Sequence, residues 1–164
     1  MEIRPECAAD GSAIQTVTTS AFARAPHSSG TEPRIIHALR AGGALSISLV
    51  AVEGEEVVGH IAFSPVVIGE QAGWQGLGPI SVRPDRQSEG IGSALVREGL
   101  RRLKETGAGG CVLVGDPAFY RRFGFRSVPD LTYGAVPREY VLALAFSGRV
   151  PVGEVKYHAA FEAP

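Results

Sequence analysis

The chain has 164 residues, of which 45% are hydrophobic and 20% charged, and this suits one globular domain over residues 1–164. The formal net charge is −1, and the 16 lysine and arginine residues are spread along the sequence, which argues against a nucleic-acid partner. No stretch approaches the roughly 20 consecutive apolar residues of a membrane span, and the first ten residues lack a secretion-signal pattern. We therefore expect a cytoplasmic protein with no membrane partner. Cys7 and Cys111 lie far apart and outside any Cys/His cluster, so neither a disulfide framework nor a metal site is expected.

The first forty residues are predicted to form one short strand and two helices. A strand at residues 2–4 precedes a helix over residues 8–22, in which apolar residues recur at helical spacing. A loop at residues 25–30 leads to a second helix over residues 31–40, which ends before a pair of glycines.

Three strands are expected next. The β-branched runs at 47–52 and 57–68 flank a short glycine-containing turn at 53–56, which predicts a hairpin. Pro65 indicates a bulge or a sheet edge near the end of the second run. A third strand at 76–82 follows a Gly/Gln loop and stops before a proline.

The second half begins with the clearest helix, residues 90–104, which has one apolar stripe and charged residues opposite. A buried strand at 111–114 and a short helix through Arg122 follow, and the tail predicts strands at 140–146 and 155–157. The order of elements indicates a mixed α/β domain with an antiparallel first half and at least one strand–helix–strand crossover.

A glycine-containing loop joins the strand at 76–82 to the helix at 90–104. Gly90 and Gly92 lack the Cβ atoms that would keep a phosphate away, and the first helical turn presents free N–H groups at the positive end of the helix dipole. Arg86 adds a charged donor beside them. This arrangement predicts an anion site.

The residue types at fixed spacings distinguish between the phosphate-binding motifs that this segment could represent. A Rossmann fingerprint needs a third glycine where this chain has Leu95, and the Gly-Lys-Ser/Thr of a P-loop is absent. The remaining pattern, Gln87-x-x-Gly90-x-Gly92, resembles the acetyl-CoA signature of the GNAT superfamily, Arg/Gln-x-x-Gly-x-Gly/Ala. Taken alone, so short a motif also suits an ordinary glycine-rich helix start.

A second motif supports the resemblance. Residues 116–125, Asp-Pro-Ala-Phe-Tyr-Arg-Arg-Phe-Gly-Phe, look like the family's late motif, a short helix bearing Phe-Tyr that ends in a Gly-Phe turn. Residues 156–161 resemble the ending of the YhbS-like subgroup, so the likeness covers most of the chain from about Ile47 onward. It implies the GNAT-type acyl-CoA N-acyltransferase fold, an α/β domain whose central, mixed and mostly antiparallel sheet is flanked by helices.

The resemblance also implies an activity. Such an enzyme moves an acetyl group from acetyl-CoA to a primary amine by direct attack in a ternary complex, without a metal. The coenzyme-binding positions that it implies are Ile80, Ser81, Val82, Arg86, Gln87, Ser88, Glu89, Gly90, Ile91, Gly92 and Ser93. The first three would line the acetyl and pantetheine arm through main-chain groups. Ser88 and Glu89 depart from the family pattern, and an inward-pointing Glu89 carboxylate would repel the pyrophosphate.

Two catalytic roles follow from the resemblance. Tyr120 occupies the position that often donates a proton to the leaving thiolate, with a packed structural tyrosine as the alternative. No acidic residue lies in the strand at 76–82, where several family members carry their base. Glu32 is the first candidate, against a plain role as a first-turn acid, and His27 and His60 are the others.

The acceptor is left open. A small-molecule amine or a peptide amine, such as a protein N-terminus or lysine, would serve, and the acyl group need not be acetyl. A catalytically silent acyl-CoA-binding or regulatory domain is the alternative from another class. The oligomeric state, a homodimer included, is also open.

Overall fold

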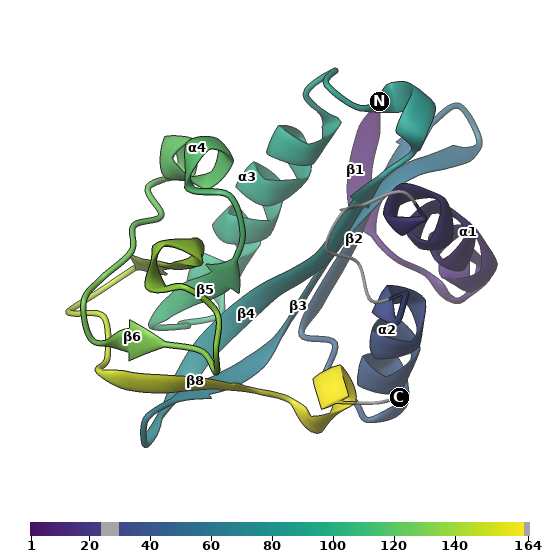
Figure 1. Cartoon of the computed structure of the whole chain (residues 1–164). Coiled ribbons are helices and arrows are strands. Elements are labelled where there is room, and N and C mark those ends of the chain that lie inside the picture. Colours follow the sequence, from purple (N-terminus) through teal and green to yellow (C-terminus); the bar gives the residue numbers. More distant parts are fainter. Residues whose placement is uncertain (24–29, 163–164) are drawn as a thin grey trace.

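A computed structural model describes residues 1–23 and 30–162, which form a mixed α/β fold around one twisted sheet (Figure 1). The strands are β1 (Glu2–Pro5), β2 (Ile47–Glu53), β3 (Glu56–Ile68), β4 (Gln71–Val82), β5 (Gly110–Val114), β6 (Leu131–Thr132), β7 (Val141–Ala145) and β8 (Gly153–Tyr157). The helices are α1 (Gly11–Phe22), α2 (Glu32–Ala41), α3 (Ile91–Glu105) and α4 (Pro117–Tyr120). Short 3₁₀ turns occupy Ala8–Asp10, Pro84–Arg86, Arg121–Phe123, Arg138–Tyr140 and Ala159–Glu162.

The sheet is mostly antiparallel, with the strand order β1-β2-β3-β4-β5-β7. β4 and β5 are parallel neighbours joined through α3, which confirms the predicted strand–helix–strand crossover. β8 pairs with the far end of β3, and the two-residue β6 pairs with β8. The first half is antiparallel throughout, as the sequence predicts.

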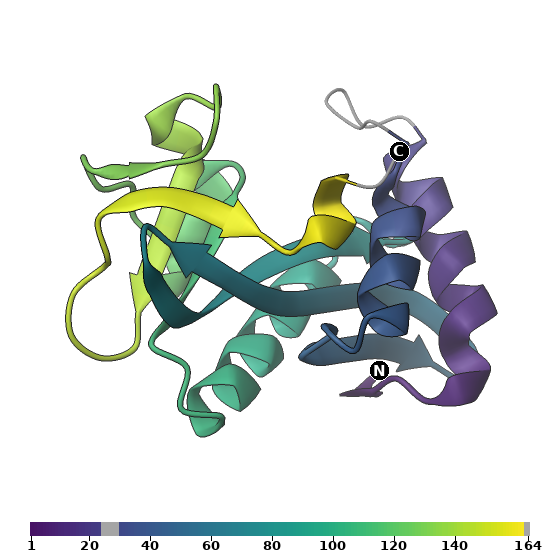
Figure 2. The same ribbon diagram turned by 90° about the horizontal axis from the view of Figure 1, so that it is seen from below.

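Helices cover both faces of the sheet (Figure 2). Leu49 of β2 packs in one cluster with Leu95 of α3, whereas its neighbour Val50 packs with Ile14 of α1 and Ile36 of α2. Successive strand residues point to opposite faces, so α3 covers one face and the α1–α2 pair covers the other.

β4 is longer than the sequence predicts, since it begins at Gln71 and not at residue 76. The glycine-rich stretch predicted as a loop is strand because Trp74 is buried in the core. A Cβ at Gly110 would lie within 2.4 Å of the Trp74 ring, so the indole fills the space of a missing side chain. A tight turn, with Gly69 at φ +60°, joins β3 to β4.

Pro65 lies where β3 changes its neighbour. The residues up to Phe63 pair with β2, and those from Val66 onward pair with β8. Two register shifts against β4 flank the proline. The predicted irregularity is therefore confirmed, and a residue that cannot donate a ladder hydrogen bond occupies the gap between two pairing partners.

β4 separates from β5 part-way along its length. Parallel pairing covers only Trp74–Gly76 of β4. Just beyond, one extra residue on β4 lies between the partners of Ile61 and Phe63, which is a bulge and turns the strand. Within the part of the chain that the structure describes, Ile80–Val82 pair with β3 on one side and with no residue of β5 on the other. The sheet opens at this point.

Candidate active site

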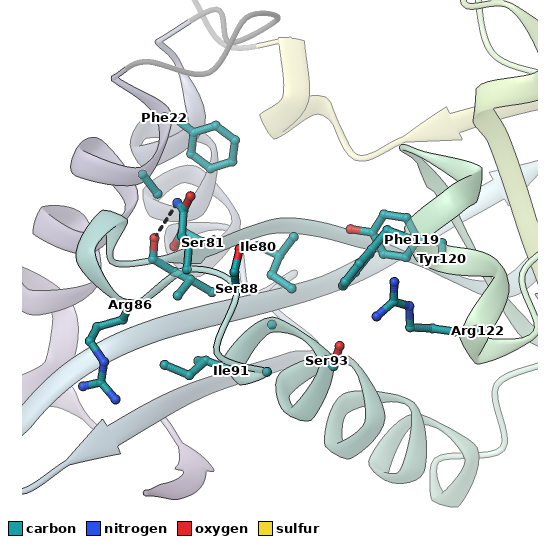
Figure 3. A pocket seen from close by; sticks show the side chains of 15 residues that line it. Phe22, Ile80, Ser81, Arg86, Ser88, Ile91, Ser93, Phe119, Tyr120 and Arg122 are labelled. Carbon is teal, nitrogen blue, oxygen red and sulfur yellow. Dashed lines mark hydrogen bonds between the residues drawn. The ribbon is translucent and has the colours of Figure 1, made fainter.

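A cavity of about 570 Å³ occupies the opening between β4 and the segment that follows β5 (Figure 3). Its walls come from the end of α1, the end of β4, the loop and first turn of α3, and α4. The lining residues are Ala21, Phe22, Ile80, Ser81, Val82, Arg86, Gln87, Ser88, Gly90, Ile91, Gly92, Ser93, Phe119, Tyr120 and Arg122. Of the eleven coenzyme positions implied by the sequence resemblance, only Glu89 is missing from this lining.

The loop before α3 is shaped for a bound anion. Gly90, the N-cap of α3, has φ +88°, and among the described residues no side chain caps the helix, so its first-turn N–H groups are open to a ligand. Ser88 also has a positive φ, of 65°. Gln87 donates from Nε2 to the carbonyl oxygen of Val82 (3.1 Å), which ties the loop to the strand (Figure 3). Backbone amides at the positive end of a fifteen-residue helix therefore face the cavity.

Two carboxylates near the loop bind Arg86. Glu53 accepts from its Nη2 at 2.6 Å, and Glu89 accepts from its Nε at 3.0 Å. The hydrogen bonds that Arg86 donates to these carboxylates raise its pKa above the ordinary value. The Glu89 side chain thus lies against a cation and is not part of the described cavity lining, so the inward-pointing arrangement considered from the sequence is not observed.

Tyr120 lies on the opposite wall and is 9% exposed, with its hydroxyl directed toward β4 (Figure 3). Its ring packs edge-on against Phe119 and Phe125. Burial raises the pKa of Tyr120 to about 12, so the phenol keeps its proton throughout the physiological range. A protonated hydroxyl at a cavity wall is a competent proton donor.

Sequence reasoning missed four lining residues: Ala21, Phe22, Phe119 and Arg122. Arg122 places its guanidinium 4.7 Å from the ring centre of Phe119 and has no carboxylate partner among residues 1–23 and 30–162. Phe119 precedes Tyr120 in α4 and Arg122 follows it in the next 3₁₀ turn, and this proximity in sequence is a signal that could have found them. No comparable local signal marks Ala21 and Phe22.

The three candidate bases have different outcomes. Glu32 begins α2 and is absent from the described lining of the cavity, so its role stays a prediction. His27 lies outside the described residues. His60 is fully buried on β3, on the face covered by α1 and α2, and its Nε2 lies 2.8 Å from the Ser48 hydroxyl.

Burial lowers the pKa of His60 to about 4, with Glu6 opposing this shift and Arg40 adding to it. Between pH 6.5 and 4.5 the unfolded chain gains a proton on this imidazole and the folded chain does not, so stability falls as the pH falls. We expect His60 to account for a loss of about 2 kcal/mol in unfolding free energy over this range. Urea titrations of the wild type and of His60→Gln at both pH values measure it. An equal pH dependence in the two proteins would contradict the neutral buried state.

Comparison with known proteins agrees with this geometry. A family model described as an acetyltransferase (GNAT) domain matches residues 44–127. The chain is 40% identical over 127 residues to the uncharacterized N-acetyltransferase YhbS of Escherichia coli K12. The aligned region covers 76% of this chain and 73% of that protein. The chain belongs to the GNAT acetyltransferase family. It is therefore an N-acetyltransferase that uses acetyl-CoA, and the YhbS-like resemblance predicted from the sequence is confirmed.

Two crystal structures of GNAT proteins share this fold over nearly the whole chain. A GNAT family acetyltransferase from Brucella melitensis in complex with acetyl-CoA is 50% identical, with a TM-score of 0.88 and coverage of 98% of this chain and 97% of that one. YhbS from Escherichia coli in complex with CoA is 32% identical, with a TM-score of 0.89 and coverage of 99% and 92%. The predicted GNAT fold class is thus confirmed.

The described residues contain neither a helix suited to a membrane nor a cluster suited to a metal ion. None of the helices at residues 1–23 and 30–162 is long and apolar enough to cross a membrane. Over the same ranges, no group of three or more histidine, cysteine, aspartate and glutamate side chains is arranged to hold a metal ion.

Proposed function

We propose that the protein transfers an acetyl group from acetyl-CoA directly to a primary amine while both substrates are bound in the cavity between β4 and α4. The observation that carries this proposal is the convergence of three groups on one cavity: the uncapped first turn of α3, the unpaired edge of β4 and the protonated Tyr120 hydroxyl. The three groups would bind the pyrophosphate, bind the pantetheine arm and donate a proton to the leaving thiolate, in that order.

The coenzyme is assigned to the α3 side of the cavity. Backbone N–H groups of residues 87–92 would receive the pyrophosphate, since glycine at 90 and 92 leaves the approach open. The free edge of Ile80–Val82 would bind the pantetheine arm as an added strand does. A backbone N–H of this edge would also stabilise the oxyanion formed when the amine attacks the thioester carbon.

The amine is assigned to the α1 side, where Ala21 and Phe22 complete the wall. Attack forms the C–N bond and breaks the C–S bond. Tyr120 gives its hydroxyl proton to the departing thiolate and regains one from the newly bonded nitrogen. Tyr120 thus supplies the proton that the leaving group needs. The acceptor can be a small-molecule amine or a peptide amine.

Thiol release from acetyl-CoA tests the proposal. We expect the purified protein to release CoA thiol faster with at least one member of a panel of small amines and N-terminal peptides than without an amine. A catalytically silent acyl-CoA-binding domain would bind acetyl-CoA and release no thiol with any member. Coenzyme binding measured in parallel shows that the protein is folded and loaded, so the presence or absence of thiol release separates the two functions.

Glu32 remains a prediction from the sequence. It would hold the substrate cation or accept its proton from the first turn of α2. In that role Glu32→Gln raises the KM of the amine and alters the acidic limb of the pH–rate profile. Superimposable profiles and an equal KM would contradict the role.

A further inference from the structure

A series of hydrogen-bonded polar groups, partly exposed at Arg40, Glu6 and Ser48 and fully buried at His60, crosses the sheet face that α1 and α2 cover. Arg40 of α2 donates to Glu6 from Nε at 2.9 Å and from Nη2 at 3.0 Å. Glu6 also accepts a hydrogen bond from the Ser48 hydroxyl, and the oxygen of Ser48 lies 2.8 Å from Nε2 of His60. The Glu6 carboxylate is 3.9 Å from the same imidazole nitrogen.

The protons shared among Glu6, Ser48 and His60 have one consistent arrangement. Burial raises the pKa of Glu6, but hydrogen bonds from Arg40 and Ser48 bring it below its ordinary value, so the carboxylate is ionised and only accepts. Ser48 has a single hydroxyl proton and gives it to Glu6. Its oxygen must then accept from Nε2–H of His60. The neutral imidazole therefore carries its proton on Nε2 and a lone pair on Nδ1.

That lone pair has no hydrogen-bond partner among the residues that the structure describes, although His60 is 0% exposed. An unpaired acceptor in the protein interior is costly and calls for a polar neighbour or a water molecule. The cross-strand partner of His60 is Ser81 of β4. Directly opposed residues have Cβ atoms about 5 Å apart on the same face, so one water or one rotation of the serine can join the two groups.

Ser81 stands between His60 and the cavity. It is 4% exposed, lines the cavity, and places its Oγ 3.4 Å from the Thr18 hydroxyl of α1. One turn further along α1, Ala21 and Phe22 line the same cavity. Ser81 is thus on the α1 side of the cavity, the side to which the amine is assigned.

We propose that His60, acting through the Ser81 hydroxyl, accepts the proton that the acceptor ammonium must lose before it attacks the thioester. The ammonium gives a proton to Ser81 Oγ, directly or across one water, while the Ser81 hydroxyl proton passes to Nδ1 of His60. The neutral amine that results attacks the thioester carbon. After the acetylated product leaves, the imidazolium returns its proton to solvent.

Burial disfavours a charged His60 and lowers its pKa to about 4, so the imidazolium forms only transiently and depends on the nearby carboxylate of Glu6. Two charged groups act on the ring: Glu6, in the segment after β1, and Arg40 of α2, which Glu6 already neutralises. From α1 and β4 the neighbouring polar groups are the neutral hydroxyls of Thr18 and Ser81. Glu6 can stabilise the imidazolium through Ser48, as the third member of a catalytic triad stabilises its histidine. His60 is a positioning residue in this scheme, because it reaches the amine only through Ser81.

The inference rests on the proposed function, and its test uses acetyl-CoA with 2-phenylethylamine as the probe amine. We expect His60→Gln and Ser81→Ala each to lower kcat/KM at pH 7 by roughly 100-fold, the range of general base catalysis. The double variant should be no slower than either single variant, because both changes break one proton path. Ser64→Ala, a buried hydroxyl on the same strand as His60 and outside the cavity lining, is the matched control and should keep the wild-type rate.

The pH dependence separates a proton path from a structural defect. Near pH 10, close to the pKa of a primary amine, much of the acceptor is already neutral and needs no base. The loss in both variants should therefore shrink to a few-fold there. An equal loss at pH 7 and pH 10, or independent losses that multiply in the double variant, would overturn the proposal.

Coenzyme binding keeps this test distinct from that of the proposed function. Calorimetric titration should give the same acetyl-CoA affinity for the wild type, His60→Gln and Ser81→Ala, since the serine contributes main-chain groups to the coenzyme. A wild type that binds no acetyl-CoA would refute the proposed function. A His60→Gln protein that turns over at the wild-type rate would refute only the role of His60.

Discussion

Gly92→Val is expected to lower the affinity for acetyl-CoA by about 100-fold, because the new side chain enters the space in front of the α3 amides. Loss of one or two hydrogen bonds to a charged phosphate accounts for this magnitude. The change should not disturb the fold, since a Cβ at residue 92 would meet only Cγ2 of Val82, at an ordinary 3.8 Å. Gly90 is a less informative position, because its φ of +88° strains any side chain.

Calorimetric titration with acetyl-CoA measures the effect of Gly92→Val. Ala94→Val is the matched control, since residue 94 lies in the same helix, is not part of the cavity lining, and receives the same side chain. It should keep the wild-type affinity. Wild-type affinity in a folded Gly92→Val protein would place the pyrophosphate elsewhere.

Tyr120→Phe is expected to lower kcat by a factor of 10² to 10⁴ while the acetyl-CoA affinity stays constant, since only a proton donor is removed. The phenyl ring can keep its edge-on packing against Phe119 and Phe125. Tyr140→Phe, at a residue 43% exposed and outside the cavity, is the control for loss of a phenol. Rates measured with any accepted amine decide the matter, and a near-wild-type kcat for Tyr120→Phe would make the tyrosine purely structural.

The coenzyme loop was predictable from the sequence because its chemistry is local. A strand, two glycines two residues apart and the start of an amphipathic helix are contiguous, and their geometry follows from glycine conformation and the unsatisfied amides of a helix start. The short helix with Tyr120 was found in the same way, from an aspartate cap and a proline. Asp116 does accept a hydrogen bond from the Ala118 N–H.

The opening of the sheet was not predictable, because it depends on how strands pair. No local pattern shows that β4 leaves β5 after Gly76, or that a bulge follows. The start of β4 was misplaced for a related reason: glycine and glutamine suggest a loop, and only the packing of Trp74 against Gly109 and Gly110 makes the segment a buried strand. Tertiary contacts outweigh local propensity at such positions.

The role proposed for His60 could not be predicted from the sequence for the same reason. In the sequence it is one histidine in a β-branched run, and it is predicted only as an alternative base to Glu32. Its importance comes from Ser48 on one neighbouring strand and Ser81 on the other, each brought beside it by strand register. These three residues are far apart in the sequence, and only the pairing of the strands brings them together.

Mass spectrometry of a reaction with isotopically labelled acetyl-CoA tests the central claim most directly. The protein is incubated with the labelled coenzyme and an amine that stimulates thiol release. The masses of the amine and of the intact protein are then measured. Direct transfer in a ternary complex predicts one labelled acetyl group on the amine nitrogen and no acetylated protein intermediate. A labelled acetyl group that appears first on the protein and then passes to the amine, or an amine that stays unlabelled while thiol is released, would contradict the account.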